Sequence, residues 1–459
     1  MHLFAPEDPR PLHFMGIAGA GMSALALVAL RRGVPVTGCD PSPEGAADAT
    51  RLGAKVQPTH DPAHVAGVRA VVHTVAVPPD HPELAAARAA GVPVLSRAAA
   101  LAHVVADGRV IGVAGTHGKT TTTAMITAAL VAAGRDPMGL VGGRVAAWDG
   151  NVRFGDERLY VVEADEYDRS FLQLSPAVAV VNNVEPDHME CYGSVGDLEA
   201  AFVQFASGAE RVLIGADDGG ARRVGSAVRA PIWSVGAAAD ADVRLDGVVR
   251  EPGRTAARVR LPGGGDVALE LRVPGLHNLR NAAMALAAAV VAGADPAAAA
   301  RGLAAFDGVG RRFELLGTAG GVTVIDDYAH HPSEVAATLG AARQRYPARR
   351  LVAVFQPHLF TRTRDLGQAT GIVLAMADVA IVAPIYPARE APIPGVTGEI
   401  VADAARQAGG EVHWVSDRGA VLRQVEDVVA VGDVVVTLGA GDITDVGRQF
   451  VRRRGTVSV

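Results

Sequence analysis

Residues 111–123 read IGVAGTHGKTTTT, and this stretch decides the fold of the chain around it. The apolar run over residues 110–114 predicts a buried strand, and a helix-compatible sequence, TTTAMITAALVAAG, follows the glycine-rich loop. A glycine loop between a strand and a helix can hold phosphate groups, because its backbone N–H groups face the oxygens and the helix N-terminus adds partial positive charge. In such a loop Lys119 reaches the terminal phosphates and the Thr120 hydroxyl ligates Mg²⁺.

The loop is a shortened variant of the usual phosphate-binding pattern. The strict pattern places a glycine where Val113 stands. A glycine-rich turn without a ligand is the alternative interpretation, but it explains neither Lys119 nor the threonines that follow it. We therefore expect a nucleotide-binding loop here.

Composition indicates a globular protein of several domains. At 459 residues the chain is too long for a single hydrophobic core, and its length predicts about three domains. Hydrophobic residues make up 49% and charged residues 20%, and no stretch approaches the roughly 18–20 apolar residues of a membrane span. The N-terminal sequence MHLFAPEDPRPLHF lacks the basic and apolar regions of a signal peptide, so we expect no membrane association.

The number of cysteines and the net charge indicate which cellular compartment and which binding partners to expect. The only two cysteines, Cys39 and Cys191, argue against a disulfide framework and favour a reducing cytoplasm. The net charge is −6 without a basic block, so nucleic acid is not an expected partner.

Residues 1–108 alternate strand and helix signals, which predicts a parallel sheet. The strand LHFMGIAG enters a glycine turn in which Gly19, Gly21 and Ala24 fit the pattern G-x-G-x-x-A, and Asp40 closes the next strand. This pattern predicts a pyrophosphate at a helix N-terminus. Both NAD(P) and UDP satisfy it, so the pattern alone leaves both open.

Residues 109–310 contain two apolar strands that end in acidic or histidine-containing loops, LYVVEADEYDRSF and AVAVVNNVEPDHMECYG. Glu163 directly follows the first apolar run, so we expect it at the carboxyl edge of the sheet, where with His188 it would hold a divalent cation. Mg²⁺ prefers oxygen ligands, so a structural role for His188 stays open. Asp165 and Asp168 are either site residues or solvated loop charges.

Residues 311–459 place histidines and arginines at neighbouring strand ends. The polar residues after the two strands are Asp326, Asp327, Tyr328, His330 and His331, then Gln356, His358, Arg362 and Arg364. Arginines among histidines suit a ligand that carries a carboxylate, because guanidinium grips carboxylate in a planar fork. The alternative is that the arginines are surface residues at a helix start.

Eight motifs occur in one order along the chain: GTHGKTTTT, VEADEYDRSF, NNVEPDHMECYG, HNLRNA, GRRFE, DDYAHHPSEV, FQPHLFTRT and PIPGVTG. In this combination the chain resembles, over nearly all its length, the Mur ligases of bacterial peptidoglycan synthesis, and among them the branch that adds L-alanine to UDP-N-acetylmuramate. The resemblance implies an α/β fold of three domains. These are a Rossmann-like UDP-sugar-binding domain over 1–108, a P-loop ATPase domain with a mainly parallel sheet over 109–310, and a Rossmann-like amino-acid-binding domain over 311–459.

The resemblance also implies roles for individual residues. Those expected to bind ATP are Gly115, Thr116, His117, Gly118, Lys119, Thr120, Thr121, His277, Asn278, Asn281 and Arg312. Those expected to bind the UDP-sugar are Gly16, Ala18, Gly19, Ala20, Gly21, Met22, Asp40 and His73. Thr120, Glu163 and His188 are the expected Mg²⁺ ligands. The expected catalytic residues are Lys119, His188, His330, His331 and Arg362.

Two positions depart from the family pattern. Many relatives read QPHRYTR, with two arginines that grip the carboxylate of the amino acid, whereas Leu359 replaces the first arginine here and Arg362 remains. Several other Mur ligases carry a carbamylated lysine where Val203 stands. No lysine follows Lys119 in this chain, so that modification is excluded from the central site.

The implied reaction is an ATP-dependent ligation through an acyl phosphate, which the amine of L-alanine attacks. The residue that accepts the proton of the amine stays open among His188, His330 and His331. The alternatives are a ligase that recycles a tripeptide onto the same UDP-sugar, an NAD(P)-dependent oxidoreductase and a non-catalytic UDP-sugar sensor.

We expect the protein to be cytoplasmic and to be a monomer or a weak homodimer.

Overall fold

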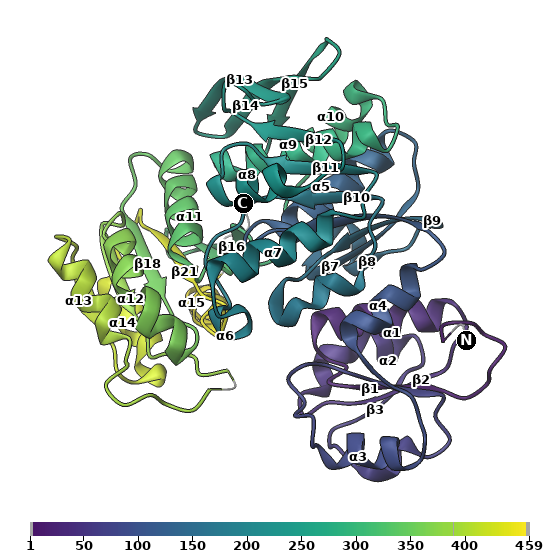
Figure 1. The fold of residues 1–459 in the computed structure, drawn as a ribbon. Coiled ribbons are helices and arrows are strands. Elements are labelled where there is room, and N and C mark those ends of the chain that lie inside the picture. The colour runs from purple at the N-terminus through teal and green to yellow at the C-terminus, as the bar shows by residue number, and fades with distance from the viewer. Residues whose placement is uncertain (1–2, 389, 456–459) are drawn as a thin grey trace. The chain divides into compact units, whose positions relative to one another are not determined.

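The computed structural model describes residues 3–388 and 390–455, which form three β-sheets in two compact units (Figure 1). Unit 1 comprises the described residues of Met1–Gly247, Ala257–Leu269 and Arg280–Phe306. Unit 2 comprises Val248–Ala256, Glu270–Leu279 and the described residues of Asp307–Val459. Among the helices described, none is both long and apolar enough to cross a membrane.

The first sheet of unit 1 has five parallel strands in the order β3-β2-β1-β4-β5. Its strands are β1 (Leu12–Met15), β2 (Val36–Cys39), β3 (Lys55–Gln57), β4 (Ala70–His73) and β5 (Val94–Ser96). The helices around it are α1 (Ala20–Arg31), η1 (Pro43–Ala46), α2 (Ala47–Arg51), η2 (Pro62–Val65), α3 (Pro82–Ala89) and α4 (Arg97–Val105).

The two faces of this sheet have separate cores. Helices α1, α2 and α4 lie on one face of the sheet and α3 on the other (Figure 1). Leu12 and Phe14 of β1 belong to the core on the first face, whereas Met15 packs with Leu84 of α3 on the second. This split follows from the alternation of side chains along a strand, which sends neighbouring residues to opposite faces.

The second sheet of unit 1 carries the glycine loop. Seven of its strands have the order β12-β11-β10-β6-β9-β7-β8, and only β8 at the edge is antiparallel to its neighbour. The strands are β6 (Arg109–Ala114), β7 (Pro137–Val145), β8 (Gly150–Arg153), β9 (Asp156–Glu163), β10 (Val178–Val181), β11 (Arg211–Gly215) and β12 (Ile232–Gly236). The helices are α5 (Lys119–Ala132), η3 (Ala146–Trp148), η4 (Tyr167–Gln173), α6 (Met189–Tyr192), α7 (Val195–Ala206), α8 (Gly219–Ala227) and α10 (Pro296–Ala304).

Four further elements contain residues of both units. They are β13 (Val243–Glu251), β14 (Arg254–Arg260), β15 (Asp266–Leu271) and α9 (Leu276–Val291).

Unit 2 has a six-stranded sheet in the order β16-β17-β21-β18-β19-β20, parallel apart from β16. Its strands are β16 (Glu314–Ala319), β17 (Val322–Asp327), β18 (Leu351–Phe355), β19 (Val379–Val382), β20 (Val412–Trp414) and β21 (Val434–Leu438). Its helices are α11 (Pro332–Arg345), α12 (Phe360–Leu374), α13 (Glu399–Gln407), η5 (Arg418–Ala420), α14 (Val421–Val428) and α15 (Thr444–Arg454). One core contains side chains of α11, α12 and α13, and a second contains those of α14 and α15.

The predicted fold class, an α/β protein of three domains with mainly parallel sheets, is confirmed. The boundaries 1–108, 109–310 and 311–459 stay predictions, and the first two sheets belong to one compact unit.

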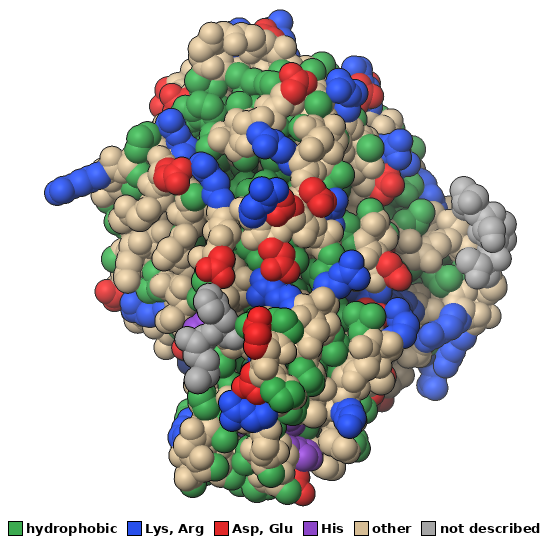
Figure 2. Space-filling model, turned by 90° about the vertical axis from the view of Figure 1, so that its right-hand side faces the viewer, with side chains coloured by type: hydrophobic (Ala, Val, Ile, Leu, Met, Phe, Trp, Pro, Cys, Tyr) green, Lys and Arg blue, Asp and Glu red, His purple; other side chains and the backbone are tan. Residues whose placement is uncertain are grey.

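Among the described side chains on the face drawn in Figure 2, basic and acidic groups are interspersed.

Candidate active site

The glycine loop between β6 and α5 has a backbone that only glycine adopts easily. Gly115 has φ 139° and Gly118 has φ 78°. A Cβ atom on Gly118 would lie 2.8 Å from Oδ1 of Asn281, so the close approach also requires glycine. The predicted loop residue and the predicted Asn281 therefore lie side by side in unit 1.

Two asparagines after β10 hold the loop in place. The Asn183 side chain accepts a hydrogen bond from His117 N at 2.7 Å, and its amide donates to His117 O at 3.2 Å. Asn182 donates to His117 O at 3.3 Å and to Thr122 Oγ1 at 3.0 Å. The sequence analysis gave neither asparagine a role, although both stand in the quoted motif NNVEPDH.

Lys119 is bound by a buried carboxylate. Its Nζ donates to both oxygens of Glu166, at 2.9 and 2.7 Å, and to Gly115 O at 2.8 Å. Burial by itself lowers the pKa of Lys119, but the carboxylates of Glu166 and Asp165 outweigh it and hold the pKa above its ordinary value. Burial raises the pKa of Glu166, although Lys119 opposes that shift. Glu166 stands in the acidic motif VEADEYDRSF, but no role was predicted for it.

Thr120 and Glu163 meet at the start of α5. The Thr120 hydroxyl donates to the Glu163 carboxylate at 2.9 and 3.1 Å, and Gly142 N donates to the same carboxylate at 2.7 Å. A carboxylate and a hydroxyl at a phosphate loop are ligand types that suit Mg²⁺. The structure thus brings together two of the three predicted metal ligands.

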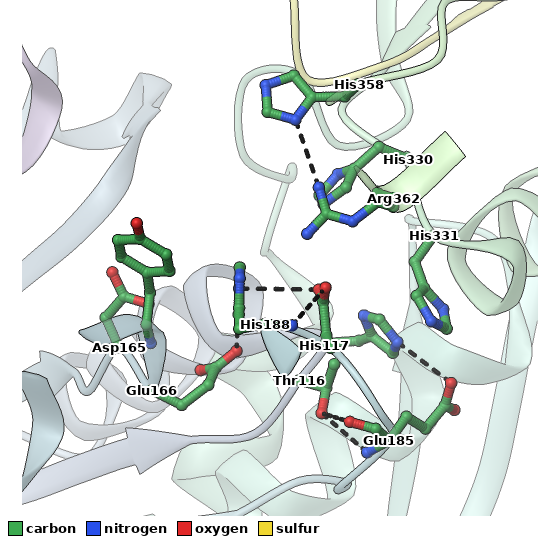
Figure 3. A network of polar contacts seen from close by, with 12 residues as sticks. Thr116, His117, Asp165, Glu166, Glu185, His188, His330, His331, His358 and Arg362 are labelled. Atoms are coloured by element: carbon green, nitrogen blue, oxygen red, sulfur yellow. Dashed lines mark hydrogen bonds and ion pairs between the residues drawn. The ribbon is translucent and has the colours of Figure 1, made fainter. Parts of the chain in front are cut away.

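His188 has acidic neighbours. Its Nε2 lies 4.0 Å from Glu166 Oε1 (Figure 3). The same nitrogen lies 3.7 Å from Asp187, and Nδ1 lies 3.7 Å from Glu190. The residue has φ 56°, a left-handed conformation that is uncommon outside glycine. The ring therefore lies beside the Lys119–Glu166 pair.

Thr116 and His117 contact the loop that follows β10 (Figure 3). Thr116 Oγ1 donates to Glu185 O at 3.2 Å and accepts from Glu185 N at 2.9 Å. His117 Nε2 lies 3.4 Å from the Glu185 carboxylate. The Thr121 side chain at the start of α5 is buried.

The turn after β1 is a second glycine turn, in the first sheet. Gly16 has φ 80°, and Gly19 caps α1, so the next residues, Ala20, Gly21 and Met22, form the first turn of that helix. Asp40 accepts hydrogen bonds from Ala18 N at 3.0 Å and from Ser42 N at 2.9 Å. Asp40 thus fixes the turn through the backbone.

An arginine and a histidine lie near this turn. A Cβ atom on Gly21 would lie 2.9 Å from the Arg97 side chain, whose guanidinium donates to Asp165 at 3.1 Å. Arg97 places a cation beside the start of α1, and the sequence analysis missed it. His73, at the end of β4, bonds through Nδ1 with Thr74 O at 3.1 Å.

In unit 2 four aromatic rings, from residues that follow three different strands, form a row. We call Tyr328, His330, His358 and Tyr386 the ring cluster. Tyr328 lies 5.5 Å from His330, His330 lies 5.9 Å from His358, and His358 stacks on Tyr386 at 5.7 Å. Arg362, in the first turn of α12, bonds with His358 at 3.3 Å (Figure 3). The structure therefore brings His330 and Arg362 to one cluster, and Tyr386 joins it without having been predicted.

Two arginines cover the other end of this row. The guanidinium carbons of Arg311 and Arg312 lie 4.9 and 5.0 Å from the Tyr328 ring centre. Burial raises the pKa of Asp327 to about 6, although Arg312 and two backbone N–H groups oppose the shift. Arg312 also lies 3.7 Å from Glu334.

Three predicted residues make local structural contacts. His331 caps α11, because its side chain accepts a hydrogen bond from Ser333 N at 3.4 Å. Asn278 donates to Pro274 O at 2.7 Å, and the His277 ring packs against Gly275.

Leu359 is 5% exposed, so its side chain belongs to the core.

Comparison with known proteins finds three family domains along the chain. Residues 11–109 match the Mur ligase family, catalytic domain, residues 113–289 match the Mur ligase middle domain, and residues 311–441 match the Mur ligase, glutamate ligase domain. A UDP-N-acetylmuramate–L-alanine ligase from Kineococcus radiotolerans is 46% identical over 96% of this chain and 95% of its own length. The Streptomyces coelicolor protein of the same name is 43% identical over 96% of this chain and 97% of its own length.

Solved structures show the same fold. The UDP-N-acetylmuramate–alanine ligase of Thermotoga maritima is 30% identical, covers 96% of this chain and 98% of its own, and gives a TM-score of 0.82. A murein peptide ligase from Psychrobacter arcticus, 24% identical, shares the fold with a TM-score of 0.73 over 98% of this chain and 100% of its own. The matched segments together span the phosphate loop, the glycine turn and the ring cluster, and the chain therefore belongs to the Mur ligase family.

Proposed function

We propose that this enzyme joins the amino group of L-alanine to the lactyl carboxylate of UDP-N-acetylmuramate, with ATP as co-substrate, in the synthesis of peptidoglycan precursors. One observation carries the proposal: relatives named for this reaction are 46% and 43% identical over nearly the full length of both chains. Membership of the Mur ligase family supports the use of ATP.

The chemistry requires ATP because forming an amide from a free carboxylate in water is unfavourable. The γ-phosphoryl group passes to the carboxylate and leaves ADP, and the neutral amine then displaces phosphate from the acyl phosphate. The first step brings two anions together, so positioning and charge neutralisation do most of the work. We assign that role to Lys119, the loop 115–121 and Asn281, with His277, Asn278 and Arg312 as further nucleotide contacts.

We also propose Mg²⁺ as the cation of the phosphate site. Thr120 and Glu163, which are already hydrogen-bonded to each other at 2.9 Å, are the first ligands, and His188 is the third. Bound there, the ion would neutralise charge on the nucleotide phosphates.

The UDP-sugar is assigned to the first sheet of unit 1, where turn 16–22, Asp40 and His73 surround the start of α1. The turn presents backbone N–H groups at a helix N-terminus, which suits a pyrophosphate. Arg97 adds a cation beside it.

The carboxylate of L-alanine is assigned to Arg362 of unit 2, beside His330 and His358. A guanidinium grips a carboxylate in a bidentate fork. Because leucine stands at position 359, Arg362 is the arginine of this motif that we assign to the carboxylate. His188, His330 and His331 are the candidates for accepting the proton of the amine.

The full-length protein tests the proposal directly. Phosphate release should be measured with ATP, Mg²⁺ and UDP-N-acetylmuramate while single amino acids, the tripeptide of the recycling reaction and NADH are offered in parallel. We expect release with L-alanine, weaker release with glycine and L-serine because a small pocket discriminates poorly between neighbours, and none when EDTA removes the metal. Glu163→Gln should raise the Mg²⁺ concentration needed for half-maximal activity.

Three outcomes would overturn it. Release with the tripeptide but not with L-alanine would identify the recycling reaction. Tight NADH binding would assign the glycine turn to NAD(P) instead of UDP. Binding of UDP-N-acetylmuramate without any phosphate release would indicate a sensor. We further propose a cytoplasmic location, which cell fractionation would test, and a monomer or weak homodimer, which gel filtration over a range of concentrations would test.

A further inference from the structure

A cluster of side chains that could bind a metal lies at the first sheet of unit 1, among residues to which no role was assigned above. His13, Cys39, His64 and Glu83 place one ligand atom each within 4.8 Å of one another. His60 joins them, with Nδ1 2.9 Å from Cys39 Sγ. We call His13, Cys39, His60, His64 and Glu83 the histidine–cysteine cluster.

The fold assembles this cluster from five separate segments on the α3 face of the sheet. His13 lies on β1 between two residues whose side chains enter the opposite core, so its own side chain points toward α3. Cys39 ends β2, His64 lies in η2, and Glu83 lies in the first turn of α3. His60 lies between β3 and η2.

The distances within the cluster resemble the edges of a tetrahedral site. Zn²⁺ binds nitrogen and carboxylate oxygen at about 2.0–2.2 Å and sulfur at about 2.3 Å, which separates neighbouring ligand atoms by roughly 3.3–3.7 Å. Cys39 Sγ lies 3.4 Å from His13 Nε2 and 3.6 Å from either Glu83 oxygen. His64 Nδ1 lies 3.4 Å from Glu83 Oε1. His13 Nε2 and Glu83 Oε1, at 2.7 Å, would have to separate, and the pairs that His64 makes with His13 and Cys39 lie within 4.8 Å.

The side chains at the centre of the cluster are buried. Glu83 and Cys39 are 0% exposed and His13 is 1% exposed. Nδ1 of His64 is buried and has no hydrogen-bond partner among the described residues. This nitrogen faces the Glu83 carboxylate at 3.4 Å, and together with the Cys39 thiol and the His13 ring these groups form a donor set that suits a transition metal.

Neighbouring contacts orient the ligands. Nδ1 of His13 bonds with Thr37 Oγ1 at 2.9 Å, which fixes the ring so that Nε2 faces the cluster. Such outer contacts are typical of metal-binding histidines. The side chain of His64 is 21% exposed and that of His60 24% exposed, which gives an ion a path from solvent.

We propose that His13, Cys39, His64 and Glu83 bind a structural Zn²⁺ ion, with His60 bonded to the Cys39 sulfur. One thiolate, two imidazoles and one carboxylate are a borderline-soft set that favours zinc over Mg²⁺. Four protein ligands leave no open position, so the site is structural and not catalytic. Cys39 directly precedes Asp40, so the ion would also hold the strand end that fixes the UDP-sugar turn.

The test uses full-length protein, purified without a metal-affinity tag from zinc-supplemented medium. Elemental analysis should find one zinc per chain in the wild type, and Cys39→Ser and Glu83→Gln should lose it. Cys191→Ser removes the other cysteine of the chain, so it serves as the matched control and should keep the zinc. Removing zinc with a chelator should lower the thermal midpoint of the wild type but not that of Cys39→Ser.

Cobalt substitution separates this site from adventitious binding elsewhere. Co²⁺ bound to Cys39 should give a thiolate charge-transfer band that Cys191→Ser retains and Cys39→Ser lacks. Should Cys39→Ser fail to fold, His64→Ala, whose side chain is partly exposed, should alter the visible cobalt spectrum. Equal metal content in wild type and Cys39→Ser, or wild type that takes up neither zinc nor cobalt, would overturn the proposal and leave a metal-free network.

Discussion

The phosphate loop of unit 1 and the ring cluster of unit 2 are built in opposite ways. The loop is one continuous segment whose shape comes from two glycines with positive φ, at 139° and 78°. The ring cluster instead collects Tyr328, His330, His358 and Tyr386 from three strand ends. The loop takes its shape from glycines within one segment, and Asn182 and Asn183 then hold it, whereas the ring cluster depends entirely on how separate strands are paired.

The two sites also differ in charge. In the loop, Lys119 is surrounded by the carboxylates of Glu163, Asp165 and Glu166, which hold its pKa above the ordinary value although burial opposes this. In unit 2, Arg311 and Arg312 stack on Tyr328, and Arg362 bonds with His358. The first arrangement suits phosphate together with a metal cation, and the second suits a ligand carboxylate.

The largest expected effect tests whether Lys119 serves catalysis or only neutralises Glu166. Lys119→Ala should abolish phosphate release, because the transferring phosphoryl group loses its main cationic partner. It also leaves the buried Glu166, which is 2% exposed, without its counter-ion. Breaking such a pair costs roughly 3–5 kcal/mol of stability, so urea unfolding should shift to lower concentration.

The matched control separates the two roles. In the double variant Lys119→Ala with Glu166→Gln, the uncompensated charge is gone, so stability should return while activity stays absent. Near-normal turnover in Lys119→Ala would overturn the assignment of the loop. Recovery of activity in the double variant would show that Lys119 acts only through Glu166.

A second effect tests the claim that unit 2 buries a carboxylate beside its arginines. Burial raises the pKa of Asp327 from 3.8 to about 6, so the folded protein holds this proton more tightly than the unfolded chain. Stability from this group is therefore full below about pH 4 and is lost as the pH rises through about 6. The loss amounts to about 3 kcal/mol.

Asp327→Asn should remove this pH dependence. The substitution also removes an acceptor for either Phe313 N or Ala329 N, which shifts stability by a constant amount at every pH. Urea unfolding should be followed through Trp414 of β20, with Trp148 and Trp233 of unit 1 replaced by Phe in both proteins. If the stability curves of the parent protein and of Asp327→Asn run parallel between pH 4 and pH 7, the raised pKa is refuted.

The comparison explains what the sequence could predict. The strand, loop and helix around Lys119 were predictable because their residues are contiguous and the glycines indicate a loop with positive φ angles. Glu166 and Asn183 were not assigned, since their roles depend on how β9 and β10 lie beside β6. Tyr386 joins the ring cluster only through the pairing order of unit 2, which no local pattern encodes. The roles of His277, His330 and His331 in the reaction stay predictions.

The smallest expected effect concerns Arg362, the cation of the collected site. Arg362→Ala should raise the KM for L-alanine about 10- to 150-fold, which corresponds to the roughly 1.5–3 kcal/mol of a charge-assisted contact. The KM for ATP should change little, because the assignment places Arg362 on the amino acid. Arg362→Lys should recover only part of the loss, since an ammonium cannot make the bidentate fork.

Arg364 is the matched control on the same helix: it pairs with Asp365 at 2.7 Å, and its side chain is 54% exposed. Arg364→Ala should leave both KM values unchanged. If Arg362→Ala behaves like Arg364→Ala, the carboxylate is held by other residues and the collected site does not extend to α12.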